Sequence, residues 1–504
     1  MATKYKMYIG GDWVNSESGK FFDVINPATE KIIAEVPLGT RGDAKKAVDA
    51  ARDAFDKGTW SNESPGERAR ILWGLADLVE KNLHSLAKLE STNVGKTIKY
   101  SRDSDIPFIV DNLRFFSGAG RILSGLAASE YIDYHQKKRH KVEGMSIIRR
   151  EPVGVVGAIV PWNYPLYIAV WKIAPALAAG NTMVIKPASY TPLTLLEFAK
   201  LVEKAGVPKG VFNVVTGPGE VIGEELAANP KVDMIALTGD TTTGRRIMEL
   251  ASQTVKRVHL ELGGKAPFII LKDANLHAAA KGAAVAAFWN TAQDCTAATR
   301  VYVYEDQHDE FVKMLVEETE RIEIGDPMKE KTDMGPLISA RQRDRTENYV
   351  QVALQEGAKL VYGGKRPEHL KKGFYYTPTI FTNVHQKMKI CQEEIFGPVL
   401  AVFKYKAIDE VIHKANDVIY GLAASVWGKD ITTLMRIARE LKFGTVWINE
   451  HGLLASEMPH GGFKQSGFGK DLSLYSLEEY TQLKHVFIDM TGMVKKPWYD
   501  VVIS

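Results

Sequence analysis

The chain contains very few cysteines. Cys295 and Cys391 are the only two among 504 residues, too few for disulfides to hold a chain of this length together. We therefore expect both thiols to be free in a reducing compartment. The opening sequence, MATKYKMYIGGDWV, has neither the basic and apolar regions of an export signal nor an Arg- and Ser-rich amphipathic character. These features predict a cytoplasmic protein.

Long apolar runs and one-sided charge are also absent. The most apolar stretch, VGVVGAIVPW, ends at a proline, well short of the roughly 18 residues that a membrane helix needs. The 64 Lys and Arg residues nearly balance the 61 Asp and Glu residues, giving a net charge of +3, so we expect no nucleic-acid partner. The basic run QKKRHK at 136–141 is interpreted as an exposed hairpin or loop, because no aromatic residues interleave with it. No histidine spacing predicts a metal site.

The order of apolar and amphipathic segments predicts an α/β fold. From residue 151 onward, runs rich in Val and Ile alternate with segments of helical periodicity, which is typical of parallel sheets with crossover helices. We predict a doubly wound, Rossmann-like dinucleotide-binding domain over 1–128 and 148–260, with covering helices at 43–55 and 66–82. A second alternating series predicts an α/β catalytic domain over 261–475. The segments 129–147 and 476–504 predict a hairpin and partner strand, a small β element suited to forming a dimer or tetramer.

Two residues in unusual contexts suggest a chemistry. Glu261 lies in LELGGKAP, at the boundary between the two predicted domains, and Cys295 lies in TAQDCTAATR. A thiolate can add to an aldehyde carbon, and a carboxylate can then activate water. The alternatives are an inert buried thiol and a solvated strand end. Small and polar neighbours favour access to Cys295, and flanking leucines favour an ion pair or a raised pKa for Glu261. Cys391 is interpreted as structural.

Other polar residues follow predicted strands. Asn163, in PWNYPL, could donate to a developing oxyanion, although a turn asparagine is the common alternative. Lys186, in VIKPAS, could reach a ribose hydroxyl or a phosphate. The glycine clusters at 217–223 and 237–244 each stand between a strand and a helix, whose N-terminus could face a pyrophosphate. Neither cluster has the spacing GxGxxG, so each remains a hypothesis.

Taken together, these motifs resemble the aldehyde dehydrogenase superfamily over nearly the whole chain. The matching segments, in the family's order, are NPATE, PWNYP, KPAS, GPG, TGDTTTG, LELGGK, the Cys295 segment, EEIFGPV and PHGGFKQSGFG. The resemblance implies oxidation of an aldehyde to an acid with NAD or NADP, through a cysteine thiohemiacetal and a thioester.

The resemblance also implies roles for individual residues. Cys295 would be the nucleophile, Glu261 the general base and Asn163 an oxyanion donor; Lys186 completes the catalytic set and also holds a cofactor ribose. The implied cofactor site consists of Ile159, Trp162, Lys186, Ser189, Gly219, Gly223, Gly239, Asp240, Gly244, Leu262, Glu394 and Phe396.

Two positions depart from the family pattern. Ser189 stands where members that prefer NAD carry a glutamate, whose charge repels a 2′-phosphate by about 4 kcal/mol at 4 Å and intermediate dielectric. NADP is therefore admissible. Asp240 stands where many members have serine, and its charge should weaken pyrophosphate binding unless it caps the following helix.

For the substrate, the resemblance is closest to aminobutyraldehyde and related aminoaldehyde dehydrogenases, through SDIPFIVDNLRFFSGAGR and SEMPHGGFKQSGFGKDLSLYSLEEYT. It implies a small aminoaldehyde such as 4-aminobutanal. Three acidic residues would attract its amine at the tunnel mouth, namely Asp105, Glu450 and Glu457. Three further residues would line an apolar neck, namely Tyr164, Trp171 and Leu454. Succinic semialdehyde, glyceraldehyde or lactaldehyde remain alternative substrates. Acyl transfer to coenzyme A and a non-catalytic relative are disfavoured by the intact Glu261 and Cys295.

Overall fold

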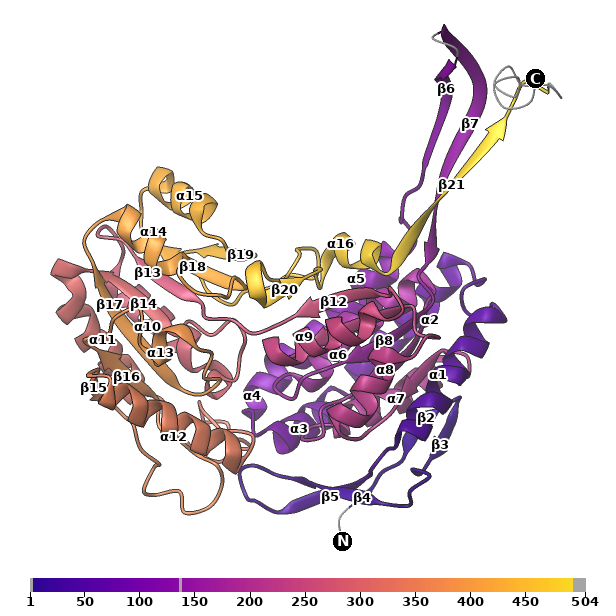
Figure 1. Cartoon of the computed structure of the whole chain (residues 1–504). Helices are drawn as coiled ribbons and strands as arrows, with labels where there is room; N and C mark the ends of the chain where they lie inside the picture. The colour runs from indigo at the N-terminus through magenta and orange to yellow at the C-terminus, as the bar shows by residue number, and fades with distance from the viewer. Residues whose placement is uncertain (1–2, 136–137, 493–504) are drawn as a thin grey trace.

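The first large sheet has the doubly wound topology that the sequence predicts. The computed structural model describes residues 3–135 and 138–492 (Figure 1). The strand order is β20-β12-β11-β8-β9-β10-β2-β3. The parallel centre consists of β8 (Val155–Ile159), β9 (Thr182–Lys186), β10 (Phe212–Val214), β11 (Met234–Thr238) and β12 (Arg257–Glu261). Antiparallel strands β2 (Met7–Ile9), β3 (Asp12–Val14) and β20 (Gly467–Phe468) complete it.

The apolar runs become buried strands because helices pack against this sheet. The helices that contact its strands are α1 (Arg41–Asp56), α6 (Pro165–Ala179), α7 (Leu193–Ala205), α8 (Glu224–Ala228) and α9 (Thr241–Ser252). A further layer, α2 (Pro65–Lys81), α3 (Leu83–Val94) and α5 (Ile106–Ala119), packs on α6 and α7. From β8 the chain proceeds to β9 and β10 on one side and to β11 and β12 on the other. The strand order therefore reverses beside β8, and ligands bind at the carboxyl ends of strands near such a switch point.

A second sheet, parallel except at its edge strand β15 (Lys359–Tyr362), follows in the chain. Its order is β15-β16-β17-β14-β13-β18-β19, with β13 (Pro267–Ile270), β14 (Arg300–Tyr304), β15 (Lys359–Tyr362), β16 (Thr379–Thr382), β17 (Val399–Tyr405), β18 (Ala423–Trp427) and β19 (Thr445–Ile448). Its helices are α10 (Leu276–Phe288), α11 (His308–Glu320), α12 (Ala340–Gln355), α13 (Lys389–Gln392), α14 (Ile408–Asn416) and α15 (Ile431–Glu440). The predicted α/β fold class, with two parallel sheets, is confirmed.

A three-stranded sheet projects from the body of the molecule (Figure 1). It consists of β6 (Leu126–His135), β7 (Lys138–Pro152) and β21 (Thr481–Asp489), in the order β21-β7-β6. The hairpin is thus longer than the predicted 129–147. Within the basic run 136–141, residues 136 and 137 lie outside the described residues, as does the end of the predicted element, 493–504.

Two further features of the chain differ from the sequence prediction. The N-terminal strands β1 (Thr3–Lys4), β4 (Phe21–Ile25) and β5 (Ile32–Pro37) form a small sheet that was not anticipated. Strand β20, assigned from sequence to the second domain, pairs with β12 of the first sheet. Gly467 makes this pairing possible, because a Cβ there would overlap the carbonyl oxygen of Leu260. The chain therefore crosses back to the first sheet before α16 (Ser473–Glu479).

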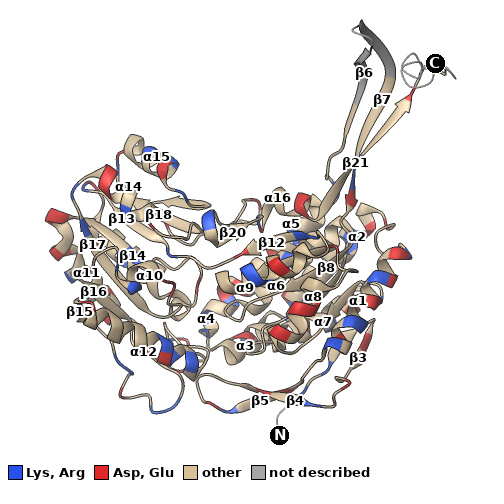
Figure 2. Cartoon of the chain, viewed as in Figure 1, with Lys and Arg blue, Asp and Glu red and all other residues tan. Residues whose placement is uncertain are grey.

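The distribution of charge indicates no surface for binding a polyanion, and the described helices include no membrane span. Basic and acidic segments are interspersed along the helices of both large sheets (Figure 2). Within residues 3–135 and 138–492, no helix combines the length and apolar character needed to cross a bilayer.

Candidate active site

A cavity of about 590 Å³ contains both residues singled out for chemistry. Cys295 and Glu261 line it together with residues that precede α5, residues of α6 and the loop after β19. Glu261 is the last residue of β12. The short connection from β12 to β13 joins the two large sheets (Figure 1), and Glu261 is the residue at which this connection begins.

The segment before Cys295 has an uncommon backbone conformation. Residues 290–292 are consecutive non-glycine residues in the left-handed region, with φ of 48°, 59° and 56°, a conformation that costs free energy and needs support from its surroundings. The Asn290 side chain donates to the backbone oxygen of Asn163 at 3.2 Å, and Gln293 Oε1 accepts from the backbone N–H of Ile338 at 2.8 Å. These bonds hold the segment that leads to Cys295.

The surroundings of Cys295 favour the protonated thiol. Burial raises its pKa well above the usual value, and the negative charges of Asp294, Glu394 and Glu261 raise it further. A buried thiolate is costly because its charge loses hydration. Cys295 therefore needs a proton acceptor, or a nearby positive charge, before it can attack a carbonyl carbon.

Two glycines bring the end of β12 against the cysteine segment. A Cβ on Gly264 would overlap the carbonyl oxygen of Cys295, and one on Gly263 would overlap the Glu394 carboxylate. The Gly264 N–H donates to Glu394 Oε1 at 2.8 Å. The LELGG motif thus joins three candidate functional residues through close backbone contacts.

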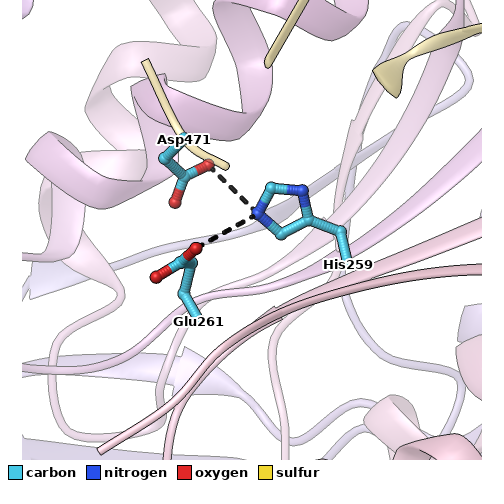
Figure 3. A group of neighbouring side chains, drawn as sticks. All are labelled: His259, Glu261 and Asp471. Atoms are coloured by element: carbon cyan, nitrogen blue, oxygen red, sulfur yellow. Dashed lines mark ion pairs between the residues drawn. The ribbon is translucent and has the colours of Figure 1, made fainter. Parts of the chain in front are cut away.

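Glu261 has the raised pKa that its apolar context suggested. The residue is 4% exposed, and its Oε1 has no hydrogen-bond partner among the described residues. Burial raises its pKa well above the usual value and the charge of Asp471 adds to this, whereas Lys172 and Lys470 act in the opposite direction. Figure 3 shows Glu261 together with His259 and Asp471, whose nearest side-chain atoms all lie within 4.8 Å of one another.

Asn163 is buried against the segment that leads to Cys295. Its Nδ2 donates to the backbone oxygen of Gln293 at 2.9 Å. A side-chain amide has two N–H groups, so one remains free of this bond. Asn163 therefore supports the nucleophile segment, although it is not among the described residues that line the cavity.

The cofactor candidates gather at the carboxyl ends of β8 and β9. Ile159 and Lys186 are register partners there. Lys186 is buried, which lowers its pKa to about 8, and its Nζ donates to the Pro187 carbonyl at 2.9 Å. Ser189 Oγ donates to the Gly217 carbonyl at 3.1 Å. A Cβ on Gly223 would meet Ile159 Cδ1 at 3.1 Å, so this glycine allows close packing beneath the site.

Asp240 caps helix α9. Its Oδ1 accepts from the backbone N–H of Thr243 at 2.9 Å. This is the helix cap that, from the sequence, would offset the effect of the Asp240 charge on pyrophosphate binding. The Gly239 N–H donates to the backbone oxygen of Glu261 at 2.9 Å. A Cβ on Gly244 would lie 2.6 Å from Leu262 Cδ1, so Gly244 allows α9 to pack against the end of β12.

The remaining cofactor candidates come from both large sheets. Burial raises the pKa of Glu394 to about 7. The rings of Trp162 and Phe396 meet edge to face, with centroids 5.2 Å apart. Gly219 begins a helical turn, and a Cβ there would meet no atom within 4 Å. Lys186 Nζ has two N–H groups left to donate, and the Glu394 carboxylate can accept. Such groups are suited to bind ribose hydroxyls.

Four of the six predicted substrate residues line the cavity: Tyr164, Trp171, Glu450 and Leu454. Asp105 and Glu457 are not among its lining residues. Asp105 is 1% exposed and forms an ion pair with Lys96 inside the protein, which corrects the expectation that its charge faces the tunnel. Glu457 is exposed outside the cavity.

Several lining residues were missed from the sequence. Aromatic rings follow one another around the wall, with centroids 4.2 Å apart for Tyr100 and Trp289 and 5.0 Å apart for Tyr167 and Trp171. Carboxylates accompany them at Asp103, Asp111 and Asp294, besides Glu450 and Glu261; none of the described lining residues is Lys or Arg. Asp294 could have been found from its position beside Cys295. The others carry no local signal, because the fold alone brings them together.

Comparison with known proteins identifies the family. The aldehyde dehydrogenase family model matches residues 13–486. The chain is 48% identical over 483 residues to betaine aldehyde dehydrogenase of Bacillus subtilis (strain 168), covering 95% of this chain and 96% of that protein. It is 42% identical over 489 residues to retinaldehyde dehydrogenase 3 of Homo sapiens, covering 96% and 93%. The solved structure of betaine aldehyde dehydrogenase from Staphylococcus aureus in complex with NAD+ matches with a TM-score of 0.93 at 39% identity, covering 97% of this chain and 95% of that one. The chain belongs to the aldehyde dehydrogenase family and is an NAD(P)-dependent aldehyde dehydrogenase.

Proposed function

We propose that this enzyme oxidises small aldehydes that carry a cationic nitrogen, such as betaine aldehyde and 4-aminobutanal, to the corresponding acids. The supporting observation is the charge of the cavity wall, which has five carboxylates and no Lys or Arg among its described residues. Asp103 is paired with Arg102. Asp111, Asp294 and Glu450 have no such cation in contact among the described residues, so they attract a positive substrate.

The aromatic wall favours the same class of substrate. Ammonium groups bind over the faces of Trp and Tyr rings, with about 0.5 to 2 kcal/mol per favourable contact. The related proteins from B. subtilis and S. aureus are betaine aldehyde dehydrogenases, but a retinaldehyde dehydrogenase is 42% identical as well. Overall identity therefore does not decide the aldehyde, and the proposal depends on the cavity.

The site supports a reaction in two halves. Once the thiol of Cys295 has lost its proton to solvent, its sulfur adds to the carbonyl carbon, forming a C–S bond as the C=O π bond opens to an oxyanion to which Asn163 donates. A bound dinucleotide would supply the two-electron acceptor that takes the aldehyde hydrogen as hydride, so that the oxyanion would become a thioester on Cys295. Glu261 then takes a proton from water as the water oxygen bonds to the thioester carbon. The C–S bond breaks, and the acid is released.

The residues present fit a dinucleotide cofactor. Lys186 and Glu394 would hold its riboses, and the N-terminus of α9 would face a phosphate. Ser189 places no negative charge where a 2′-phosphate would lie. We propose that NADP is accepted alongside NAD.

An acidic semialdehyde is a poorer fit. Its carboxylate would enter a cavity whose described wall has several carboxylates and no Lys or Arg. Both histidines of the wall are held neutral, because burial lowers the pKa of His451 and lowers that of His460 to about 4. Nothing in this wall therefore compensates a second negative charge.

A substrate panel tests the proposal. We expect kcat/KM for betaine aldehyde and 4-aminobutanal to exceed that for 3,3-dimethylbutanal, the neutral isostere of betaine aldehyde, by at least about tenfold, and to exceed that for succinic semialdehyde by more. Equal values for the neutral isostere would refute the substrate class. Coenzyme A added to the same assay tests for acyl transfer, which we expect not to occur.

We also propose that β6, β7 and β21 form an oligomerisation element. Strands β6 and β21 are the outer strands of their sheet, and such edges can pair with another chain. Both cysteines are free, which agrees with a cytoplasmic location. Light scattering of the purified protein distinguishes a dimer or tetramer from a monomer.

A further inference from the structure

Strand β12 carries a second buried titratable residue next to the proposed base. His259 and Glu261 are two residues apart, so their side chains point to the same face of the strand, and there they meet Asp471 (Figure 3). His259 Nε2 lies 3.5 Å from Asp471 Oδ1 and 3.9 Å from Glu261 Oε1. None of these three atoms has a hydrogen-bond partner among the described residues. Three buried polar atoms without a protein partner among the described residues therefore face one another on this side of β12.

The other nitrogen of His259 leads to the surface. Nδ1 lies 2.8 Å from Glu479 Oε2, and the Glu479 side chain is 31% exposed. Glu479 lines a surface hollow together with Arg150, Arg257, Lys470 and Glu478. His259, itself fully buried, therefore connects the catalytic cavity with a carboxylate at the surface.

We propose that His259 is a positioning residue that passes the proton taken by Glu261 during thioester hydrolysis to Glu479 and solvent. The proposal rests on the role of Glu261 as general base. Water loses a proton to Glu261 while its oxygen bonds to the thioester carbon. The Glu261 proton then passes, through one water, to His259 Nε2, and the Nδ1 proton passes to Glu479. After the acid has left the open cavity, Glu479 returns a proton to Nδ1 while Nε2 loses its proton by way of Glu261 to water in the cavity, which restores the starting tautomer; the net change is one proton released.

The charged groups around His259 are consistent with proton transfer from Glu261 toward Glu479. Glu261 faces it from its own strand, Asp471 from the segment before α16, and Glu479 from the end of α16. Asp471 Oδ1 faces His259 Nε2, while Asp471 Oδ2 accepts from Lys172 Nζ of α6 at 2.7 Å. Asp471 and Lys172 are both fully buried, so a proton passed to this pair stays inside, whereas Glu479 opens to the hollow.

Glycines leave room for both contacts of the relay. A Cβ on Gly469 would lie 2.8 Å from His259 Nδ1 and equally close to Glu479 Oε2, and one on Gly461 would overlap Glu261 Oε1. The Lys470 N–H donates to Glu479 Oε1 at 2.9 Å and fixes that carboxylate. The arrangement is thus built by backbone contacts rather than by flexible surface side chains.

The test is the His259→Asn enzyme, in which the amide can still donate to Glu479 but the second ring nitrogen is lost. We expect a burst of one reduced cofactor per active site at the wild-type rate, because acylation precedes the relay. The steady-state rate in weak buffer should fall about tenfold, recover with added imidazole and show an increased solvent deuterium isotope effect. Glu479→Gln should act in the same direction.

Glu478→Gln is the matched control, since Glu478 lines the same hollow but pairs with Arg150 at 3.1 Å; its rate should not change. A wild-type steady-state rate for His259→Asn would overturn the relay, and so would a loss of rate that imidazole does not restore. Failure of the proposed base itself would be seen separately, as wild-type turnover by Glu261→Gln.

Discussion

The charge of Asp294 provides a quantitative test of the substrate class. Its carboxylate lines the cavity next to Cys295 and accepts from Tyr164 Oη at 2.7 Å and from the Thr296 N–H at 2.7 Å. Asp294→Asn removes the charge and keeps the shape and an acceptor oxygen. The change also removes one cause of the raised Cys295 pKa, so absolute rates will shift for every aldehyde. A ratio of two substrates cancels that shared effect.

The magnitude follows from the cavity size. A volume of about 590 Å³ corresponds to a sphere of about 5 Å radius, so a cation inside it lies about 6 Å from a carboxylate of the wall. With an effective dielectric of about 40, between water and a closed interior, one such pair contributes about 1.4 kcal/mol, or about a factor of ten. Glu450 is exposed, and Glu450→Gln should therefore have a smaller effect, about threefold.

The assay compares kcat/KM for betaine aldehyde and 3,3-dimethylbutanal, which have the same shape and differ in charge. We expect the ratio to fall about tenfold in Asp294→Asn and further in the double variant with Glu450→Gln. High salt should reduce the ratio in the wild type as well, because part of the attraction is screened. A ratio that stays within twofold of the wild type in the double variant would refute electrostatic selection of a cationic aldehyde.

Three further predictions concern the oxyanion, the cofactor and pH. Asn163→Ala should lower kcat/KM by about 10² to 10³-fold, from about 3 to 4 kcal/mol of lost oxyanion stabilisation, with an unchanged circular dichroism spectrum; a loss below threefold would remove Asn163 from that role. Ser189→Glu should raise the NAD to NADP ratio of kcat/KM, because a carboxylate repels the 2′-phosphate, and an unchanged ratio would contradict this. Because the Glu261 pKa is raised, its base form is lost as pH falls through that raised value. The steady-state rate should therefore begin to decline well above pH 4.5. A steady-state rate that does not change between neutral pH and pH 4.5 would argue against Glu261 as base.

The fold could be predicted because its signals are local. Buried parallel strands read as apolar runs, and each is followed by a segment of helical period, so both large sheets follow from the sequence. Strand β20 could not be predicted in the same way. The strand consists of Gly467 and Phe468 only, which is too short to show an alternation of apolar and polar residues. Its pairing with β12 depends on contacts between segments about 200 residues apart.

The candidate site was predictable where a residue follows a strand or belongs to a motif, as for Glu261, Cys295 and Lys186. It was not predictable where burial decides whether a charged side chain faces the cavity or forms an ion pair in the interior. Asp105 and Glu450 were both predicted to attract the substrate amine, yet Asp105 is paired with Lys96 in the interior while Glu450 lines the cavity. His259 carries no motif of its own, and its contacts become visible only when α16 and β12 are placed together.

The most direct test of the covalent mechanism uses the Glu261→Gln enzyme. Mixed with cofactor and aldehyde, it should release one reduced cofactor per active site and then stall, because acylation proceeds while water is no longer activated. Mass spectrometry of the protein quenched after this burst should find the acyl group of the aldehyde on the peptide that contains Cys295. An acyl group on any other residue, or a burst without any acylated protein, would contradict the account.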